Sequence, residues 1–326
     1  MSVDVGYGYT KGLASGRAVS FPSVVRPAQT ADIGVGARPR GYMVSVRRDG
    51  EADLYEVGEL ALVMGGRRSW ETRAASRPDY AILALTAMRL AGAAGGVDLG
   101  VGLPLELYLS REEREALKAR LTGLEGFVSV DDAPEAVIRV DRVRVFPQGA
   151  AAYSAAVAGE PALVRGTVGV VDVGYRTTDY LVMVPRGEGA IPDRSRLGSV
   201  QVGVGEAFEA VAKAVGRERA TMLSSAAVER AVLTRTPLRL WGETVDLAAA
   251  LQREYDRLGQ EVAEHLRRVW EDALPDMAAL LVCGGGGVAL YPRLAELTPV
   301  ARLVPEPVTA NAAGYSVLLA QAEAVR

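Results

Sequence analysis

The pentapeptide VDVGY at residues 3–7 recurs letter for letter at residues 171–175, an offset of 168 positions in a chain of 326 residues. Each copy continues into a turn that carries threonine: GYTK follows the first at residues 8–11, and RTTD follows the second at residues 176–179. A repeat placed about half a chain apart indicates two domains of common design that face each other.

Both copies have the pattern of a strand, a tight turn and a second strand. The second copy predicts strands over residues 167–173 and 178–184 around a turn at residues 174–176, since both flanks are rich in valine, leucine and threonine. The first copy is short at its beginning, and we expect its chain to resume as a strand over residues 17–21. The sequence therefore predicts one such hairpin in each half of the chain.

Helical and strand patterns alternate in both halves. Apolar residues at steps of three and four predict helices, and Ser110 with Glu113 three positions later is typical of a capped helix start. The predicted helices span residues 79–91, 110–121, 147–158, 205–215, 247–272 and 288–295, and the further predicted strands span residues 98–103, 136–145, 279–282 and 301–303. This alternation favours an α/β fold.

The same patterns suggest where the two domains begin and end. We expect a first domain over residues 1–155, with a small β-rich insertion at about residues 30–58, to which residues 310–326 return. The second domain is expected over residues 156–309, with an insertion at about residues 187–270.

The composition is that of an ordinary globular protein, with 49% apolar and 24% charged residues. A net charge of −3 argues against a surface that coats nucleic acid, which carries a strong basic excess. The single cysteine, Cys283, excludes an intrachain disulfide or a cysteine-based metal cluster. No apolar run approaches the ~20 residues that cross a bilayer, and the N-terminus lacks a signal-peptide pattern. We expect a cytoplasmic protein without direct contacts to nucleic acid or membrane.

A strand that ends in aspartate and enters a glycine-containing turn is suited to binding phosphate together with a hydrated metal ion. Backbone N–H groups of the turn converge on the anion, and glycine lets the backbone approach it closely. Since Mg²⁺ keeps several of its waters, we expect Asp4 and Asp172 to aim at one such ion while the two hairpins grip the β- and γ-phosphates. Lys11, one of three lysines among 37 basic residues, adds a compact positive charge.

A third glycine cluster, residues 284–287, lies in the stretch LVCGGGGVAL between a predicted strand and a predicted helix. A flat, bare backbone at such a place lets a base and a ribose lie close to it. A glycine-rich loop alone is a weak signal, but together with the two hairpins it forms one part of a nucleotide-binding set.

Five segments resemble, in order, the motifs of the actin, hexokinase and heat-shock chaperone superfamily. DVGYGYTK resembles its first phosphate motif, VDVGYRTTDY its second and LVCGGGGVAL its adenosine motif, while FPQGAAAY and EPVTANAAGY are similar to its two connecting helices. QVGVGEAF at residues 201–208 is similar to the segment near the ribose in short bacterial and archaeal actin-like proteins. Over nearly its full length, the chain resembles the ParM-like plasmid-segregation filaments and their archaeal relatives.

This resemblance implies two similar domains of the actin-like, ribonuclease H-like ATPase fold with a nucleotide cleft between them. It implies slow Mg-dependent ATPase activity coupled to polymerisation, with ATP or ADP and Mg²⁺ as cofactors. The implied partners are further copies of the chain in a homopolymeric filament and a DNA-binding adaptor protein. Plasmid segregation and a chromosomal cytoskeletal filament with another cargo fit the resemblance equally well.

The resemblance also implies a role for individual residues. Asp4 and Asp172 would hold Mg²⁺ through water, and Lys11 would contact the phosphates. Gln148 would position the attacking water, since such catalysis consists mainly of positioning and charge stabilisation. Contacts to the nucleotide are implied for Gly6, Tyr7, Gly8, Tyr9, Thr10, Lys11, Gly174, Tyr175, Arg176, Thr177, Thr178, Gly205, Glu206, Gly284, Gly285, Gly286 and Gly287.

Simpler interpretations stay open for several of these residues. Asp4 and Lys11 could form a surface ion pair, and Gln148 could be an ordinary residue at a helix start. Glu206 could be a first-turn acid favoured by the helix dipole. His265, among charged neighbours on the long predicted helix, is interpreted as a solvated residue and not as a base.

Two other classes of protein share the phosphate motifs. A sugar or acid kinase would need a catalytic aspartate with polar groups that read substrate hydroxyls, and we find no convincing candidate before Gln148. A peptide-binding chaperone ATPase would carry a separate substrate domain beyond the second connecting motif, and the chain stops soon after that motif.

Overall fold

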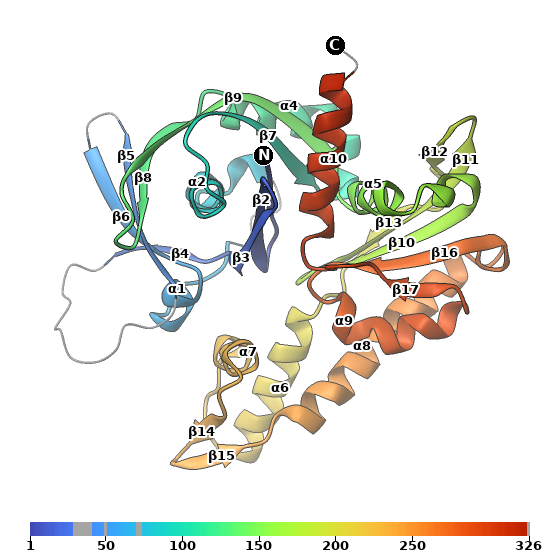
Figure 1. Ribbon diagram of the computed structural model, residues 1–326. Helices are drawn as coiled ribbons and strands as arrows, with labels where there is room; N and C mark the ends of the chain where they lie inside the picture. Colours follow the sequence, from blue (N-terminus) through green and yellow to red (C-terminus); the bar gives the residue numbers. More distant parts are fainter. Residues whose placement is uncertain (29–40, 49–50, 70–73, 325–326) are drawn as a thin grey trace. The chain divides into compact units, whose positions relative to one another are not determined.

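The residues that the computed structural model describes are 1–28, 41–48, 51–69 and 74–324. The chain forms two compact units (Figure 1). Unit 1 comprises Met1–Ala155 together with Asn311–Arg326, and unit 2 comprises Ala156–Ala310. Strands and helices alternate in both units, so the expected α/β class is confirmed. Of the β-rich insertion expected at about 30–58, residues 30–40 and 49–50 lie outside the described residues.

Unit 1 is built on one mixed sheet with the strand order β3-β2-β1-β7-β9-β8-β5-β6-β4. Its strands are β1 (Ser2–Val5), β2 (Tyr9–Ala14), β3 (Arg17–Pro22), β4 (Val25–Pro27), β5 (Tyr42–Arg48), β6 (Glu51–Val57), β7 (Gly95–Leu103), β8 (Glu125–Val130) and β9 (Ala136–Pro147). Its helices are α1 (Glu59–Val63), the 3-10 helix η1 (Ala74–Ser76), α2 (Tyr80–Leu90), α3 (Leu105–Leu109) and α4 (Arg111–Leu121). The chain passes between the units within α5 (Ala150–Gly159) and at the start of α10 (Ala310–Ala324).

The core of unit 1 lies between its sheet and α2. The sheet curves around this helix (Figure 1), which contacts β1, β2, β3, β8 and β9. Most of α2 is therefore buried, and its long apolar side chains Leu83, Leu85 and Met88 are fully inaccessible. Burial of such side chains contributes about 1.5–3 kcal/mol each, so α2 anchors the central strands that lead to the first turn.

Unit 2 contains a sheet with the order β12-β11-β10-β16-β17, to which β13 adds by pairing with β11. Its strands are β10 (Thr167–Val173), β11 (Thr178–Arg186), β12 (Gly189–Pro192), β13 (Gly198–Val200), β14 (Leu238–Leu240), β15 (Glu243–Val245), β16 (Met277–Cys283) and β17 (Ala301–Leu303). Its helices are α6 (Gly205–Glu218), α7 (Ser225–Thr234), α8 (Ala248–Val269) and α9 (Gly287–Leu294), with the 3-10 helices η2 (Pro161–Arg165), η3 (Leu274–Asp276) and η4 (Ala295–Leu297). Strands β14 and β15 form a separate hairpin.

Unit 2 has two hydrophobic clusters. The larger joins β10, β11 and β16 to α8 and α9, and its largest buried side chain is Trp270 at the end of α8. The smaller lies among α6, α7, the start of α8 and the β14–β15 hairpin. The long helix α8 contributes to both clusters and connects the sheet to the α6–α7 layer.

The repeated pentapeptide forms the same structure in both units. Strand β1 pairs antiparallel with β2 and parallel with β7, and β10 pairs antiparallel with β11 and parallel with β16. Each turn is closed by an equivalent backbone bond, from Gly6 N to Tyr9 O (3.1 Å) and from Gly174 N to Thr177 O (2.8 Å). A Cβ atom on either glycine would lie within about 3 Å of that same carbonyl oxygen. The prediction of one such hairpin in each half is confirmed.

Three local predictions were wrong. The strand after the first turn is β2, Tyr9–Ala14, and residues 17–21 belong to the next strand, β3. The sequence did not indicate β2, because the lysine and glycine of YTKGLA weaken the β pattern of that segment. The helix expected from residue 147 begins at Ala150, since Pro147 still pairs in β9 and Gly149 has φ of 73°. His265 is partly buried and lies 3.0 Å from the Tyr180 hydroxyl, so it is not simply solvated.

Candidate functional site

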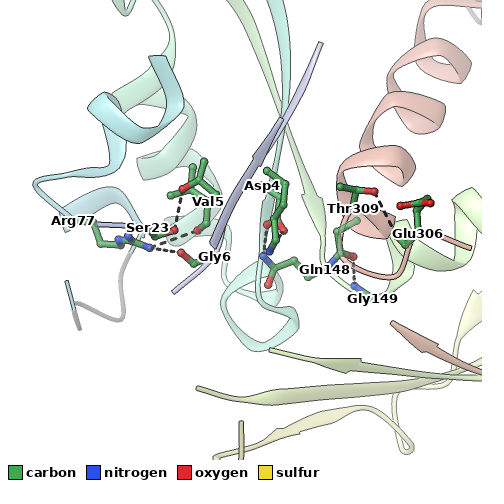
Figure 2. A network of polar contacts seen from close by, with 12 residues as sticks. Asp4, Val5, Gly6, Ser23, Arg77, Gln148, Gly149, Glu306 and Thr309 are labelled. Atoms are coloured by element: carbon green, nitrogen blue, oxygen red, sulfur yellow. Dashed lines mark hydrogen bonds and ion pairs between the residues drawn. The ribbon is translucent and has the colours of Figure 1, made fainter. Parts of the chain in front are cut away.

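In unit 1 the carboxylate of Asp4 contacts two other expected site residues, Lys11 and Gln148. Strand register places Asp4 directly opposite Lys11, and the ammonium group lies 2.9 Å from Asp4 Oδ2. From the other side, Gln148 Nε2 donates to Asp4 Oδ1 at 2.9 Å (Figure 2). The side chains of Asp4 and Lys11 are 3% and 12% exposed, so the alternative of a surface ion pair is wrong.

Gln148 lies in the turn between β9 and α5 and not in the helix. Its backbone N–H donates to Leu103 O (2.9 Å), and the next N–H, that of Gly149, donates to Asn311 Oδ1 (2.9 Å). Two neighbouring elements thus hold the backbone of this turn, while the side-chain amide is oriented by Asp4. Gln148 thus lies two residues before the first residue of α5, with its side chain bound to Asp4.

The remaining residues of the first turn divide into two groups. Gly6, Tyr7 and Gly8 form the connection between β1 and β2, and Tyr9 opens β2. Thr10 is fully buried, and its hydroxyl binds that of Ser23 at 2.9 Å, so this side chain serves the interior of unit 1.

In unit 2 the structure brings three expected nucleotide segments together around the second turn. Gly286 N donates to Val173 O (2.9 Å), which joins the glycine cluster to the end of β10. Val204 N donates to Gly174 O (3.2 Å) and Gly205 N to Tyr175 O (2.8 Å), which joins the start of α6 to the turn. Residues 174–177, 203–206 and 284–287 are therefore neighbours within one unit.

Asp172 is the next-to-last residue of β10 and is 7% exposed. Its carboxylate packs against the bare backbone of Gly284, where a Cβ atom would lie 2.4 Å from Asp172 Oδ1. The residue opposite in β11 is Asp179, also buried, so the two hairpins differ at this position: Asp4 faces a lysine and Asp172 faces an aspartate. Opposite the aspartate, the first hairpin therefore supplies a positive charge and the second does not.

Several expected contact residues of unit 2 have structural partners. The Tyr175 hydroxyl donates to Glu229 Oε2 at 3.1 Å, and its ring covers Gly205. The fully buried Thr178 hydroxyl donates to Val202 O (2.8 Å), whereas its counterpart in unit 1, Thr10, shares a hydrogen bond with the Ser23 hydroxyl. Glu206 accepts from Gly203 N (3.4 Å), and burial raises the pKa of its carboxyl.

The other expected residues of unit 2 lie in the loops of the site. Arg176 and Thr177 complete the turn between β10 and β11. Gly285 lies in the loop after β16 with open space at its Cβ position, and Gly287 opens α9. Cys283, the last residue of β16, is buried.

The residues fit a hydrated Mg²⁺ that is bound indirectly. Both oxygens of Asp4 already accept hydrogen bonds from protein groups, so this carboxylate is suited to bind a metal's water and not the metal itself. No cluster of three or more potential ligands from histidine, cysteine, aspartate and glutamate occurs within the described residues. Nor does any helix in the described part of the chain have the length and apolarity to span a membrane.

Sequence reasoning missed several residues that support these turns. Ser23 binds Thr10 through its hydroxyl and Gly8 O through its backbone N–H (2.8 Å). Arg77 binds the first turn from behind, and Glu229 binds Tyr175. These residues come from elements distant in the chain and carry no motif. Only Asn311 had a sequence signal, because it lies in the second connecting segment.

Two family models match the chain, and together they cover most of it. The model described as the N-terminal domain of actin-like proteins matches residues 2–150. The model of the C-terminal part of the MreB-like archaeal actin homologue matches residues 170–296. No curated protein sequence matches the chain.

Solved structures with the same fold match 98% of the chain and 98% of their own length. A non-polymerisable quadruple mutant of pCBH ParM has a TM-score of 0.84 at 22% identity. A 15-stranded ParM filament from Clostridium botulinum has a TM-score of 0.83 at 21% identity. The archaeal actin homologue Ta0583 in complex with ADP has a TM-score of 0.79 at 22% identity. The expected two-domain fold is thereby confirmed.

Proposed function

The chain belongs to the actin-like proteins, and we propose that it binds and slowly hydrolyses ATP and polymerises into cytoskeletal filaments. The observation that carries this proposal is the repeated hairpin, with a buried aspartate at the end of a central strand in each unit. A glycine turn closed by an equivalent backbone bond follows each aspartate. Such turns are suited to phosphate, because their backbone N–H groups converge on an anion.

Two side chains of unit 1, Lys11 and Gln148, act on the phosphates and the attacking water in this proposal, and Asp4 orients both. The Lys11 ammonium has three N–H donors, of which Asp4 takes one, and the others bind phosphate oxygens. The amide nitrogen of Gln148 donates to Asp4, which makes Oε1 the atom that accepts a hydrogen bond from the attacking water. Gln148 therefore positions the water without acting as a strong base.

Unit 2 supplies the second phosphate turn and the adenosine contacts. Asp172 would hold a nucleotide-bound Mg²⁺ through the ion's waters, and such an ion would supply positive charge against the charge that develops on the phosphates. The bare backbone of residues 284–287 accommodates the adenosine, and Glu206 at the start of α6 contacts the ribose. Support comes from the hydrogen bonds that join both segments to the second turn.

The proposed partner is a further copy of the chain. One structural relative was solved as a ParM filament and another in complex with ADP, which supports a polymer controlled by a nucleotide. A DNA-binding adaptor protein would connect such a filament to a plasmid, and a chromosomal filament with another cargo is the alternative cellular role.

The test is right-angle light scattering of the purified protein on addition of Mg-ATP, with phosphate release recorded in the same cuvette. We expect scattering to rise above a critical protein concentration and phosphate release to follow it. Mg-ADP should give no phosphate, and EDTA should suppress release. Bound ATP with neither scattering nor phosphate release would contradict the proposal and favour a kinase that lacks its acceptor.

The variant Asp172→Asn separates binding from hydrolysis in the same assay. It should retain measurable ATP binding while phosphate release falls strongly, because the metal-bound water loses its negatively charged acceptor. Asp276→Asn, which alters an exposed aspartate of unit 2, is the matched control and should behave as wild type. Unchanged turnover in Asp172→Asn would remove this residue from the mechanism.

A further inference from the structure

A buried arginine donates hydrogen bonds to two backbone carbonyls of the first turn. Arg77 lies just before α2 and is 3% exposed. Its Nη1 donates to the carbonyl oxygens of Gly6 (3.2 Å) and Val5 (3.5 Å), the two residues that lead from β1 into the turn (Figure 2).

The guanidinium group is itself fixed from several sides. Asp79 accepts from Arg77 Nε and Nη2 at 3.2 and 3.1 Å, a two-point contact that sets the plane of the group. Arg120 Nη2 donates to the Arg77 backbone carbonyl at 2.6 Å. The Tyr7 ring centroid lies 5.9 Å from the guanidinium carbon. Arg77 is therefore a rigid support and not a mobile surface cation.

The second hairpin shows what these two carbonyl contacts do. Val173 and Gly174 are the repeat counterparts of Val5 and Gly6, and their carbonyl oxygens are also bound. There the donors are backbone N–H groups, from Gly286 to Val173 O (2.9 Å) and from Val204 to Gly174 O (3.2 Å). In unit 1, one arginine side chain takes the place of two backbone donors.

Binding these carbonyls has a direct consequence for an anion. In a trans peptide the C=O and the following N–H point in opposite directions. A Gly6 carbonyl held toward Arg77 therefore turns the Tyr7 N–H away from Arg77. The carbonyls of Gly8 and Tyr9 are held as well, by Ser23 N and Gly6 N. Oxygen atoms that would repel a phosphate are thus directed into the protein.

We propose that Arg77 is a positioning residue that sets the peptide orientation of the first turn for the phosphates of a nucleoside di- or triphosphate. The inference rests on the proposed function, namely that this turn binds the phosphates of ATP. Arg77 acts through the Val5 and Gly6 carbonyls, so its contribution falls on the phosphate part of the ligand and not on the nucleoside.

The test compares ATP with adenosine on the full-length variant Arg77→Met, which keeps an unbranched apolar side chain and removes the guanidinium donors. Mg-ATP affinity is measured by calorimetry and adenosine affinity by ligand-observed NMR. Loss of hydrogen bonds to a charged group should weaken Mg-ATP binding by about tenfold or more, while adenosine affinity stays within about twofold of wild type. Arg139→Met, an exposed arginine of unit 1, is the matched control and should leave both affinities unchanged.

The outcomes separate this inference from the proposed function. Wild-type protein that fails to bind Mg-ATP would overturn both, whereas unchanged Mg-ATP affinity in Arg77→Met would overturn only the role of Arg77. Equal losses for ATP and adenosine would also overturn it, because the proposed adenosine contacts lie in unit 2 and their loss is not an effect on the first turn. A thermal unfolding midpoint that falls together with ATP affinity would overturn it as well, because it would show a structural defect of unit 1. If Arg77→Met does not fold, Arg77→Lys carries the test. Lysine keeps the positive charge but lacks the planar guanidinium donors. The affinity for ATP should therefore fall several-fold, while the affinity for adenosine should not change.

Discussion

At the scale of single residues, Asp4 fixes two side chains of different chemistry with one carboxylate. One oxygen holds the Lys11 ammonium and the other the Gln148 amide, each at 2.9 Å. Because Asp4 is 2% exposed, water does not compete strongly for either contact. A change at any of the three residues therefore disturbs the other two, and single-variant effects at this site will not add.

Lys11→Met removes the ammonium group that we place on the phosphates. Affinity for both ATP and ADP should fall by about tenfold or more, in line with the loss of charge-assisted hydrogen bonds. Isothermal titration calorimetry measures this loss. Lys118→Met, which alters an exposed lysine of α4, controls for the general loss of a positive charge. Equal affinities in wild type and Lys11→Met would exclude the phosphate role of Lys11.

Gly284→Ala tests whether the glycine loop must approach β10 closely. Gly284 has φ of 87°, and its added Cβ would lie 2.3 Å from Val173 O and 2.4 Å from Asp172 Oδ1. A strained backbone of this kind costs about 1–3 kcal/mol, and the overlap adds to it. We expect a lower unfolding midpoint and weaker nucleotide binding. Gly285→Ala, which adds its Cβ in open space, should leave the unfolding midpoint unchanged.

At the scale of elements, the sequence predicted those features that depend on local pattern. The hairpin at residues 167–184 and the helices α6, α8 and α9 follow from β-branched runs and three-four spacing. Ser110 caps α4, as predicted, by accepting from Glu113 N. The role of Arg77 could not be predicted, because its contacts with residues 5 and 6 exist only after α2 packs on the sheet. The same holds for the Gln148–Asp4 contact, which joins residues 144 positions apart.

The long helix α8 carries a titratable group that should make stability depend on pH. Burial and then Arg268 hold the pKa of His265 below its ordinary value. The unfolded chain therefore binds a proton at His265 more readily than the folded chain. The free energy of unfolding should thus be highest at neutral pH and fall as the pH drops below about 6.5, the pKa of histidine in an unfolded chain. Urea unfolding at pH 7.5 and 5.5 should show a smaller pH effect in His265→Gln than in wild type. An identical pH effect in both proteins would contradict this assignment.

At the scale of the whole molecule, unit 1 is assembled from two separate parts of the chain, whereas unit 2 is continuous. The C-terminal helix α10 completes unit 1, although more than 150 residues of the chain separate it from Ala155. Ser2 Oγ donates to Ala312 O (2.7 Å), which ties α10 to the first strand. Tyr315 is fully buried and stacks on Phe146 at a centroid distance of 5.9 Å. The last helix is thus part of the fold that positions Asp4 and Gln148.

This arrangement predicts different behaviour for fragments of the two units. A fragment of residues 156–310 should fold alone with a cooperative thermal transition by circular dichroism, because its cores are complete within one segment. A fragment of residues 1–155 should lack such a transition, since loss of a large core side chain costs about 2–5 kcal/mol and α10 supplies more than one. Joining residues 311–326 to residue 155 through a flexible linker should restore the transition. Cooperative unfolding of residues 1–155 without α10 would show instead that unit 1 does not need α10 to fold.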